Sequence, residues 1–130
     1  MLKISRETDL GLLLMVEAAK RKKAIGLKNF SKENGLPYRF LSKVAVKLTK
    51  AKLLKSKEGR DGGYKLGKAA EKIKVISVVE LLDGPIAPVG CMRGDECKSA
   101  NICGHKSLMG KLTQVVEKQL ARVSVEDIAC

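Results

Sequence analysis

Three cysteines, Cys91, Cys97 and Cys103, lie at even intervals in one short segment, with five residues between neighbours. Thiolates bind iron–sulfur clusters and soft or borderline metal ions. Structural zinc sites usually place about two to four residues between paired ligands, so these wider gaps favour a cluster over a single ion. The cysteines also leave open a zinc site, a thiol–disulfide switch without metal, and free buried thiols.

Three cysteines leave one coordination position for a fourth ligand. Its candidates are His105, Cys130, Asp9 and Glu7. A ligand other than a thiolate would bind iron less strongly and leave it more reactive toward oxygen or nitric oxide, which suits a sensor. The segment 85–104 around the cysteines is predicted to be irregular, and structureless segments of about 20 residues are unusual unless they are functional.

The positive charge of the chain is concentrated in its first part. Residues 1–76 carry 20 Lys and Arg against 7 Asp and Glu, a net charge of +13. Residues 77–130 carry 6 against 7, a net charge of −1. This uneven distribution indicates nucleic acid as the partner of the first part. A lysine-rich solvated surface is the alternative.

The first 50 residues show a helix-turn-helix pattern. We expect a first helix that is capped by Ser5 or Thr8 and ends near residue 20. A short helix should follow over 27–33, and a third helix over 37–50, with Pro37 in its first turn. Between the last two helices, Asn34 and Gly35 form the break. The buried face of the third helix is predicted to hold Leu41, Val44, Leu48 and Ala51. A separate basic face holds Arg39, Lys43, Lys47 and Lys50.

The elements that follow complete a winged helix-turn-helix. Strands over 53–56 and 64–66 flank a glycine-rich turn and predict a hairpin wing. We expect a helix over 77–82, capped by Ser77, and a final long helix over about 105–122. The apolar stripe of that last helix comprises Leu108, Leu112, Val115, Val116, Leu120 and Val123. Since little of the chain remains to cover this stripe, it predicts packing against a symmetric partner.

The predicted fold is therefore mainly α, with a small β-hairpin wing and a long C-terminal dimerisation helix. We expect a DNA-binding domain at 1–76, a short helix and cysteine segment at 77–104, and a dimerisation helix and tail at 105–130. No stretch approaches the roughly 18 apolar residues of a membrane span, and the start lacks a signal-peptide pattern. We expect a cytoplasmic protein that does not act on membranes.

Other functional classes explain only part of the chain. A single histidine and the lack of a nucleotide fingerprint argue against an enzyme, and no small organic substrate is expected. An iron–sulfur electron-transfer protein would explain the cysteines but not the basic part. A ribosomal or RNA-binding protein would explain the charge but not the cysteines.

Five motifs carry a resemblance that covers nearly the whole chain. They are TDLGLLLM at 8–15, LPYRFLSKVAVKLTKAKLLKS at 36–56, GRDGGYKL at 59–66, VVELLDGP at 78–85, and the cysteine triplet. In this order the chain resembles the Rrf-two family of bacterial winged-helix transcriptional regulators, in particular its iron–sulfur cluster-binding members (IscR, NsrR and RirA). The resemblance implies a homodimeric repressor-type regulator with crossed C-terminal helices. It would sense nitric oxide, redox state, or the supply of iron and clusters.

The resemblance also implies roles for single residues. Cys91, Cys97 and Cys103 match three ligands of a 4Fe-4S or 2Fe-2S cluster, and Asp9 matches an acidic fourth ligand from the other subunit. Some members use a histidine three residues after the last cysteine, where this chain has Lys106, so His105 is the second choice. Helix 37–50 would enter the major groove of a palindromic operator and the wing tip its minor groove. The implied DNA contacts are Lys28, Pro37, Tyr38, Arg39, Ser42, Lys43, Lys47, Arg60, Asp61 and Gly62.

Overall fold

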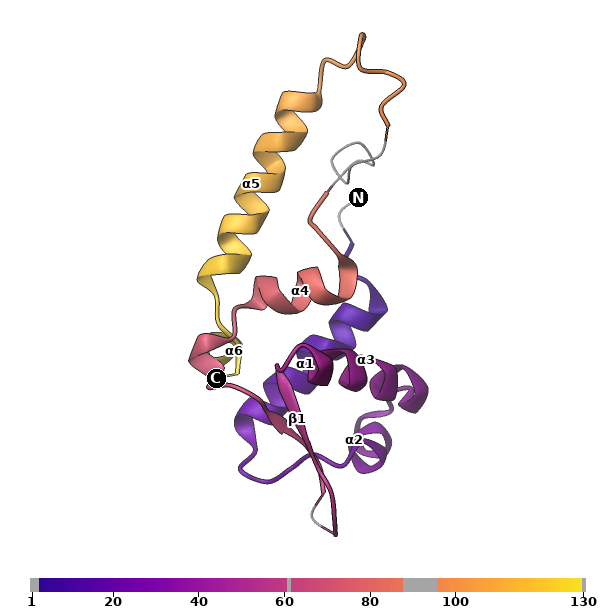
Figure 1. Ribbon diagram of the computed structural model, residues 1–130, viewed down its shortest axis with the longest axis vertical. Helices are drawn as coiled ribbons and strands as arrows, with labels where there is room; N and C mark the ends of the chain where they lie inside the picture. The colour runs from indigo at the N-terminus through magenta and orange to yellow at the C-terminus, as the bar shows by residue number, and fades with distance from the viewer. Residues whose placement is uncertain (1–2, 61, 88–95, 130) are drawn as a thin grey trace.

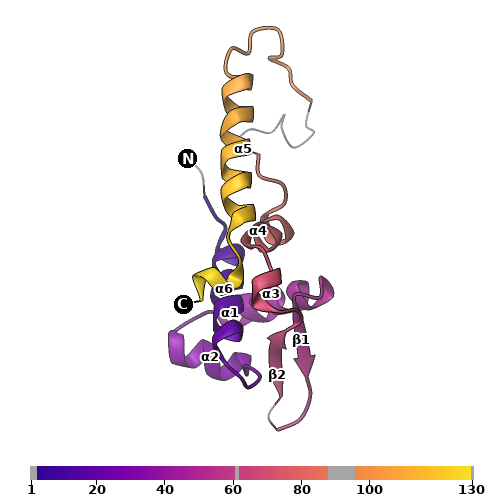
Figure 2. The same cartoon turned by 90° about the vertical axis from the view of Figure 1, so that its left-hand side faces the viewer.

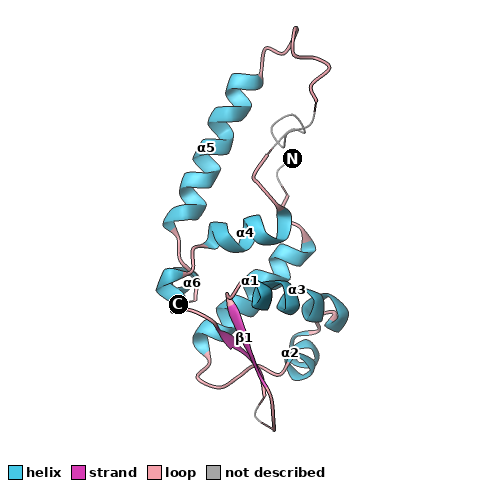
Figure 3. Cartoon of the chain, in the orientation of Figure 1, coloured by secondary structure: helices cyan, strands magenta, loops and turns pink. Residues whose placement is uncertain are grey.

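The computed structural model describes residues 3–60, 62–87 and 96–129. Its elements, in chain order, are α1 (Arg6–Lys20), α2 (Leu27–Asn34), α3 (Tyr38–Lys50), β1 (Leu54–Lys57), β2 (Gly63–Leu66), the 3-10 helix η1 (Ala70–Lys72), α4 (Val75–Asp83), α5 (Lys106–Arg122) and α6 (Val125–Ile128). The chain is mainly helical with one two-stranded hairpin (Figure 3), which confirms the predicted fold class. Within the described residues, no helix is both long and apolar enough to cross a bilayer.

The molecule is elongated, with the hairpin and the cysteine segment at opposite ends. Helices α1 to α4 and the hairpin form a body from which α5 extends as a separate rod (Figures 1 and 2). The segment 96–105, which leads into α5, lies at the far end of this rod. The tip of the hairpin lies at the other end of the long axis (Figure 1).

Helix α1 is the central element of the core. Its start is set by Ser5, whose side chain accepts a hydrogen bond from the backbone N–H of Thr8, an N-cap that satisfies a free donor of the first turn. On this helix Leu13 is exposed, whereas Met15 is fully buried. The side chains that α1 buries in the core are Leu10, Leu14, Met15 and Ala18.

Helices α2 and α3 form the predicted helix-turn-helix. Gly35 ends α2 with a φ of 62°, a left-handed conformation that glycine adopts at little cost. Helix α3 begins at Tyr38, so the prediction that Pro37 lies in its first turn is wrong by one residue; Pro37 is the N-cap. On the predicted buried face, Leu41, Val44 and Leu48 are completely covered.

The hairpin is joined to the body along β2. Strands β1 and β2 are antiparallel, with Leu54 opposite Leu66 and Lys57 opposite Gly63. On the other side of β2, Ile25 and Tyr64 exchange two backbone hydrogen bonds of 2.8 and 2.9 Å. The wing is therefore held by both its own pairing and the segment that connects α1 to α2.

The C-terminal part differs from the prediction in two places. Helix α4 begins at Val75 rather than at Ser77, and the expected cap by Ser77 is wrong because the helix starts after Lys74. The sequence analysis also did not predict α6. This helix starts with a capping box, in which the side chains of Ser124 and Asp127 each accept a hydrogen bond from the backbone N–H of the other residue. Val125 is fully buried in the core, so the tail returns from α5 to the body.

Candidate nucleic-acid interface and cysteine segment

The basic face of α3 lies at the surface, as the helical spacing predicts. Arg39, Lys43 and Lys50 are exposed, and Lys47 is half-buried. Ser42 is also half-buried, whereas Pro37 and Tyr38 at the start of the helix are exposed. Four cationic side chains thus project from one amphipathic helix whose opposite face is fixed in the core, an arrangement that suits insertion into the major groove.

Two of these lysines are not free, because Glu7 from the first turn of α1 contacts both. Its Oε2 lies 2.8 Å from the Nζ of Lys47, and its Oε1 lies 3.5 Å from the Nζ of Lys43. The hydrogen bond from Lys47, together with the positive charges of both lysines, lowers the pKa of Glu7. Glu7 was one candidate for the fourth cluster ligand, but in this structure its carboxylate is engaged by α3.

The wing places lysines opposite one another. Lys55 and Lys65 are cross-strand partners, and both are exposed. Like charges directly opposite each other destabilise a hairpin, so the pair favours a polyanion as the neighbour of this surface. Arg60 is exposed near the tip and Gly62 is half-buried; Asp61 lies outside the described residues.

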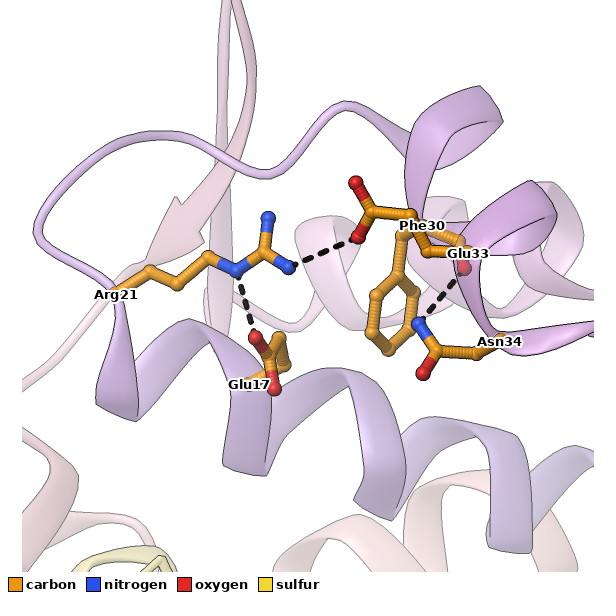
Figure 4. A network of polar contacts seen from close by, with 5 residues as sticks. All are labelled: Glu17, Arg21, Phe30, Glu33 and Asn34. Carbon is orange, nitrogen blue, oxygen red and sulfur yellow. Dashed lines mark hydrogen bonds and ion pairs between the residues drawn. The ribbon is translucent and has the colours of Figure 1, made fainter.

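The remaining predicted contact, Lys28, is exposed on α2, and a polar network fixes this helix relative to α1 (Figure 4). The guanidinium of Arg21 donates to Glu17 at 2.6 Å and to Glu33 on α2 at 3.4 Å. Both carboxylates raise the pKa of Arg21, first through the hydrogen bond to Glu17. The Asn34 side chain donates to the carbonyl of Phe30 at 3.0 Å and closes the last turn of α2.

Two of the three predicted cluster cysteines can be placed. Cys97 is exposed and Cys103 is partly buried, and both are free thiols in the irregular segment before α5. Cys91 and Cys130 lie outside the described residues. No three His, Cys, Asp or Glu side chains gather into a metal site within the described ranges, which contain only part of the predicted ligand set.

The two alternatives for the fourth ligand differ in position. His105 is exposed at the N-cap of α5, and its side chain makes no capping hydrogen bond. Asp9 is exposed on α1, and its carboxylate accepts a hydrogen bond of 2.8 Å from Arg6. His105 is therefore near Cys103 in the chain, whereas Asp9 lies on the body, and neither position decides between them.

A further contact joins the end of α4, which precedes the cysteine segment, to the start of α1. At the end of α4, Asp83 accepts a hydrogen bond of 3.1 Å from the backbone N–H of Ser5. Ser5 starts α1, and two residues later Glu7 contacts α3. The entrance to the cysteine segment is thus connected through one turn of α1 to two lysines of α3.

Sequence reasoning missed the Glu7 contacts, the Arg21 network and α6. Two local signals were available. The spacing of Ser124 and Asp127 is that of a capping box, and Glu17 and Arg21 are four residues apart, a helical salt-bridge spacing. Nothing local in the sequence joins Glu7 to lysines that lie 36 and 40 residues later.

Comparison with known proteins decides the family. A family model described as Rrf2, iron-dependent transcriptional regulator, matches residues 4–130. The chain belongs to the Rrf2 family. Its members in the comparison are transcriptional regulators rather than enzymes, and this agrees with the helix-turn-helix and wing seen here.

Individual relatives cover nearly the whole chain. The transcriptional regulator CymR of Bacillus subtilis is 30% identical over 130 residues, which are 98% of this chain and 90% of that protein. The regulator NsrR of Bacillus licheniformis is 26% identical over 131 residues, 98% of this chain and 92% of that protein. A solved structure of B. subtilis CymR, described as the global cysteine regulator, has a TM-score of 0.80 and 31% identity, and covers 99% of this chain and 97% of that one. These matches confirm the winged-helix fold.

Proposed function

We propose that this protein is a homodimeric repressor that binds a palindromic operator, and that an iron–sulfur cluster controls its affinity for this operator. Membership of the Rrf2 family makes it a DNA-binding transcriptional regulator; the cofactor, the dimer and the signal are the proposal. The observation that carries it is the presence of two free thiols, Cys97 and Cys103, in the irregular segment 96–105, which Figure 1 shows at the opposite end of the molecule from the wing. A bacterial regulator of this kind acts in the cytoplasm, where operator DNA is found.

The residues fit an iron–sulfur centre through their donor chemistry. Cys91, Cys97 and Cys103 would hold a 4Fe-4S or 2Fe-2S cluster, with Asp9 of the other subunit as fourth ligand and His105 as the alternative. When bound, the cluster supplies a centre that reacts with nitric oxide or oxygen and fixes the spacing of its ligands. The description of the family as iron-dependent supports this choice over zinc.

The dimer is supported by the uncovered face of α5. Leu108 is 61% exposed and Val115 is 64% exposed, although both belong to the apolar stripe of a long amphipathic helix. On α1, Leu13 is exposed as well. A second copy of the chain would cover these side chains around a two-fold axis, as operator symmetry requires.

The body provides a path from the cysteine segment to α3. A cluster bound after α4 would constrain the end of this helix, where Asp83 accepts a hydrogen bond of 3.1 Å from the backbone N–H of Ser5. Helix α1 packs directly on α3, so a shift of its first turn moves the basic face. A coupling of about 1–3 kcal/mol would change operator affinity by roughly 5- to 150-fold, enough for a switch.

Two measurements test this proposal. Anaerobically purified protein should be coloured and contain iron and acid-labile sulfide, and replacement of all three cysteines by serine should remove both. Its affinity for its own promoter should fall with salt, with a slope of log K against log salt near −5 if a dimer neutralises about six phosphates. An affinity that does not change with salt would contradict the DNA-binding role of the lysines.

A thiol-switched regulator without a metal is the second candidate. It is favoured by the exposure of Cys97 and by the similarity to a protein described as the global cysteine regulator. It predicts colourless protein whose promoter affinity changes on treatment with an oxidant and returns with a thiol reductant. A zinc-bound form would be colourless too, but metal analysis would find zinc. The electron-transfer alternative has no support in the comparisons.

A further inference from the structure

The first turn of α1 places a carboxylate against the recognition helix. Glu7 is the ion-pair partner of Lys47 at 2.8 Å and of Lys43 at 3.5 Å. The Glu7 side chain is only 21% exposed, whereas Lys43 is 62% exposed. The carboxylate is thus held between the two helices, and the ammonium groups that it binds face solvent.

The position of Glu7 follows from the local structure. Ser5 caps α1, so Glu7 falls in the first turn, where a negative charge is favoured by the helix dipole. Packing of α1 on α3 brings this turn alongside the middle of α3. The carboxylate is charged at neutral pH, as an ordinary glutamate is, and the Lys47 hydrogen bond lowers its pKa further.

Glu7 therefore neutralises part of the surface that would meet DNA. Within the part of the chain that the structure describes, both ion pairs of α3 end on this one carboxylate. A DNA phosphate that approaches Lys43 or Lys47 must replace Glu7 or share the lysine with it. Either event reduces the number of counterions that binding releases, and hence the electrostatic part of DNA affinity.

We infer that Glu7 is an internal competitor of DNA phosphate for Lys43 and Lys47, and that it limits sequence-independent binding by this regulator. The inference rests on the proposed DNA-binding function of α3. It assigns to Glu7 a role that differs from cluster ligation. Because sequence-independent binding is almost wholly electrostatic whereas base contacts specify the operator, the effect appears most clearly on duplexes of random sequence.

The substitution Glu7→Gln tests the inference, with Glu80→Gln as the control. Both remove one negative charge, but Glu80 is exposed on α4 and forms no ion pair with α3. Fluorescence anisotropy with a labelled random duplex, between about 50 and 300 mM KCl, gives the affinity and the salt slope of the full-length protein. Each freed lysine that gains a phosphate adds about 0.9 to the slope. We expect Glu7→Gln to make the slope of log K against log salt steeper by about 1–2 per protomer. The affinity for the random duplex should rise at least ~5-fold at about 0.1 M salt, which is roughly the effect of one added phosphate contact.

A second pair of variants separates competition from a structural role. In a Lys43→Gln, Lys47→Gln background, Glu7→Gln should leave the slope unchanged, because the lysines for which it competes are gone. The melting temperature of Glu7→Gln should stay within about 3 °C of the wild type, since partly exposed ion pairs contribute little to stability. A marked loss of melting temperature together with weaker DNA binding would show that Glu7 is structural and would overturn the inference.

The outcomes also separate the inference from the function on which it rests. If the wild type binds duplex DNA and Glu7→Gln behaves like Glu80→Gln, the inference is wrong and the proposed function stands. If the wild type binds neither its promoter nor random duplex DNA, the proposed function is wrong, and the inference fails with it.

Discussion

The attachment of the wing to the segment between α1 and α2 depends on Gly63, and replacement by alanine should weaken the fold there. Gly63 has a φ of 143°, a conformation that residues with a side chain rarely adopt. A Cβ at this position would overlap the backbone carbonyl of Ile25, which cannot move without breaking the two hydrogen bonds between Ile25 and Tyr64. The clash therefore falls on rigid backbone rather than on a flexible side chain.

The expected loss can be worked out from these contacts. Two backbone hydrogen bonds contribute about 1 kcal/mol each, and the unfavourable φ costs about 1–3 kcal/mol, so Gly63→Ala should lower the free energy of unfolding by about 4 kcal/mol. For a chain of this size that corresponds to a fall in melting temperature of roughly 12 °C. Operator affinity should fall as well, because the wing loses its attachment to the α1–α2 connection.

Gly59 provides a matched control in the same hairpin. Its φ is 108°, but a Cβ there would have no atom within 4 Å. Gly59→Ala should therefore cost only the conformational part, about 1–3 kcal/mol, or roughly 6 °C. Thermal unfolding followed by circular dichroism measures both. Equal losses in the two variants would refute the argument that the Ile25 contact is what excludes a side chain at Gly63.

Three further predictions concern α5, α6 and the Glu7 contacts. Leu108→Lys with Val115→Lys should convert the proposed dimer into monomers in analytical ultracentrifugation, whereas Gln114→Lys, which also adds a charge to an exposed position of α5, should remain dimeric. Ser124→Ala removes the cap of α6 and should lower stability by about 1 kcal/mol in denaturant unfolding; no change would mean that this cap does not stabilise α6. Since the pKa of Glu7 is lowered from its ordinary value of 4.5, its stabilising contribution is present above that value and is lost as the pH falls through the lowered native pKa. The difference in melting temperature between wild type and Glu7→Gln should therefore be constant from neutral pH down to the ordinary value of 4.5 and then decrease as the pH falls through the lowered native pKa; a difference that grows with acid would contradict this sign.

The parts of the fold that local patterns determine were predictable from the sequence. Ser5 caps the start of α1 and Gly35 caps the end of α2, and both caps act within a few residues. The spacing of Leu41, Val44 and Leu48 predicts the buried face of α3. The one-residue error at Pro37 has a similar local origin, since proline fits both the N-cap and the first helical position.

The parts that depend on distant partners were not predictable. Helix α6 has only four residues. It is fixed to the body by a backbone hydrogen bond of 2.8 Å that Val125 donates to the carbonyl of Ile73, a residue far away in the chain. The exposure of Leu13 and the burial of Met15 likewise depend on how α1 packs against α3 and α4. For the candidate site, residue types and spacing predict the basic face and the cysteines, but only the packing of α1 on α3 reveals that Glu7 engages two of the lysines.

We propose that the three cysteines control operator affinity through the iron–sulfur cluster that they would hold. The most direct measurement is an anaerobic titration of a labelled fragment of the protein's own promoter with the wild type and with the Cys91→Ser, Cys97→Ser, Cys103→Ser variant, at the same salt concentration. We predict coloured wild-type protein and a difference in dissociation constant of roughly 5-fold or more between the two. Colourless wild-type protein with a dissociation constant equal to that of the variant would contradict the claim.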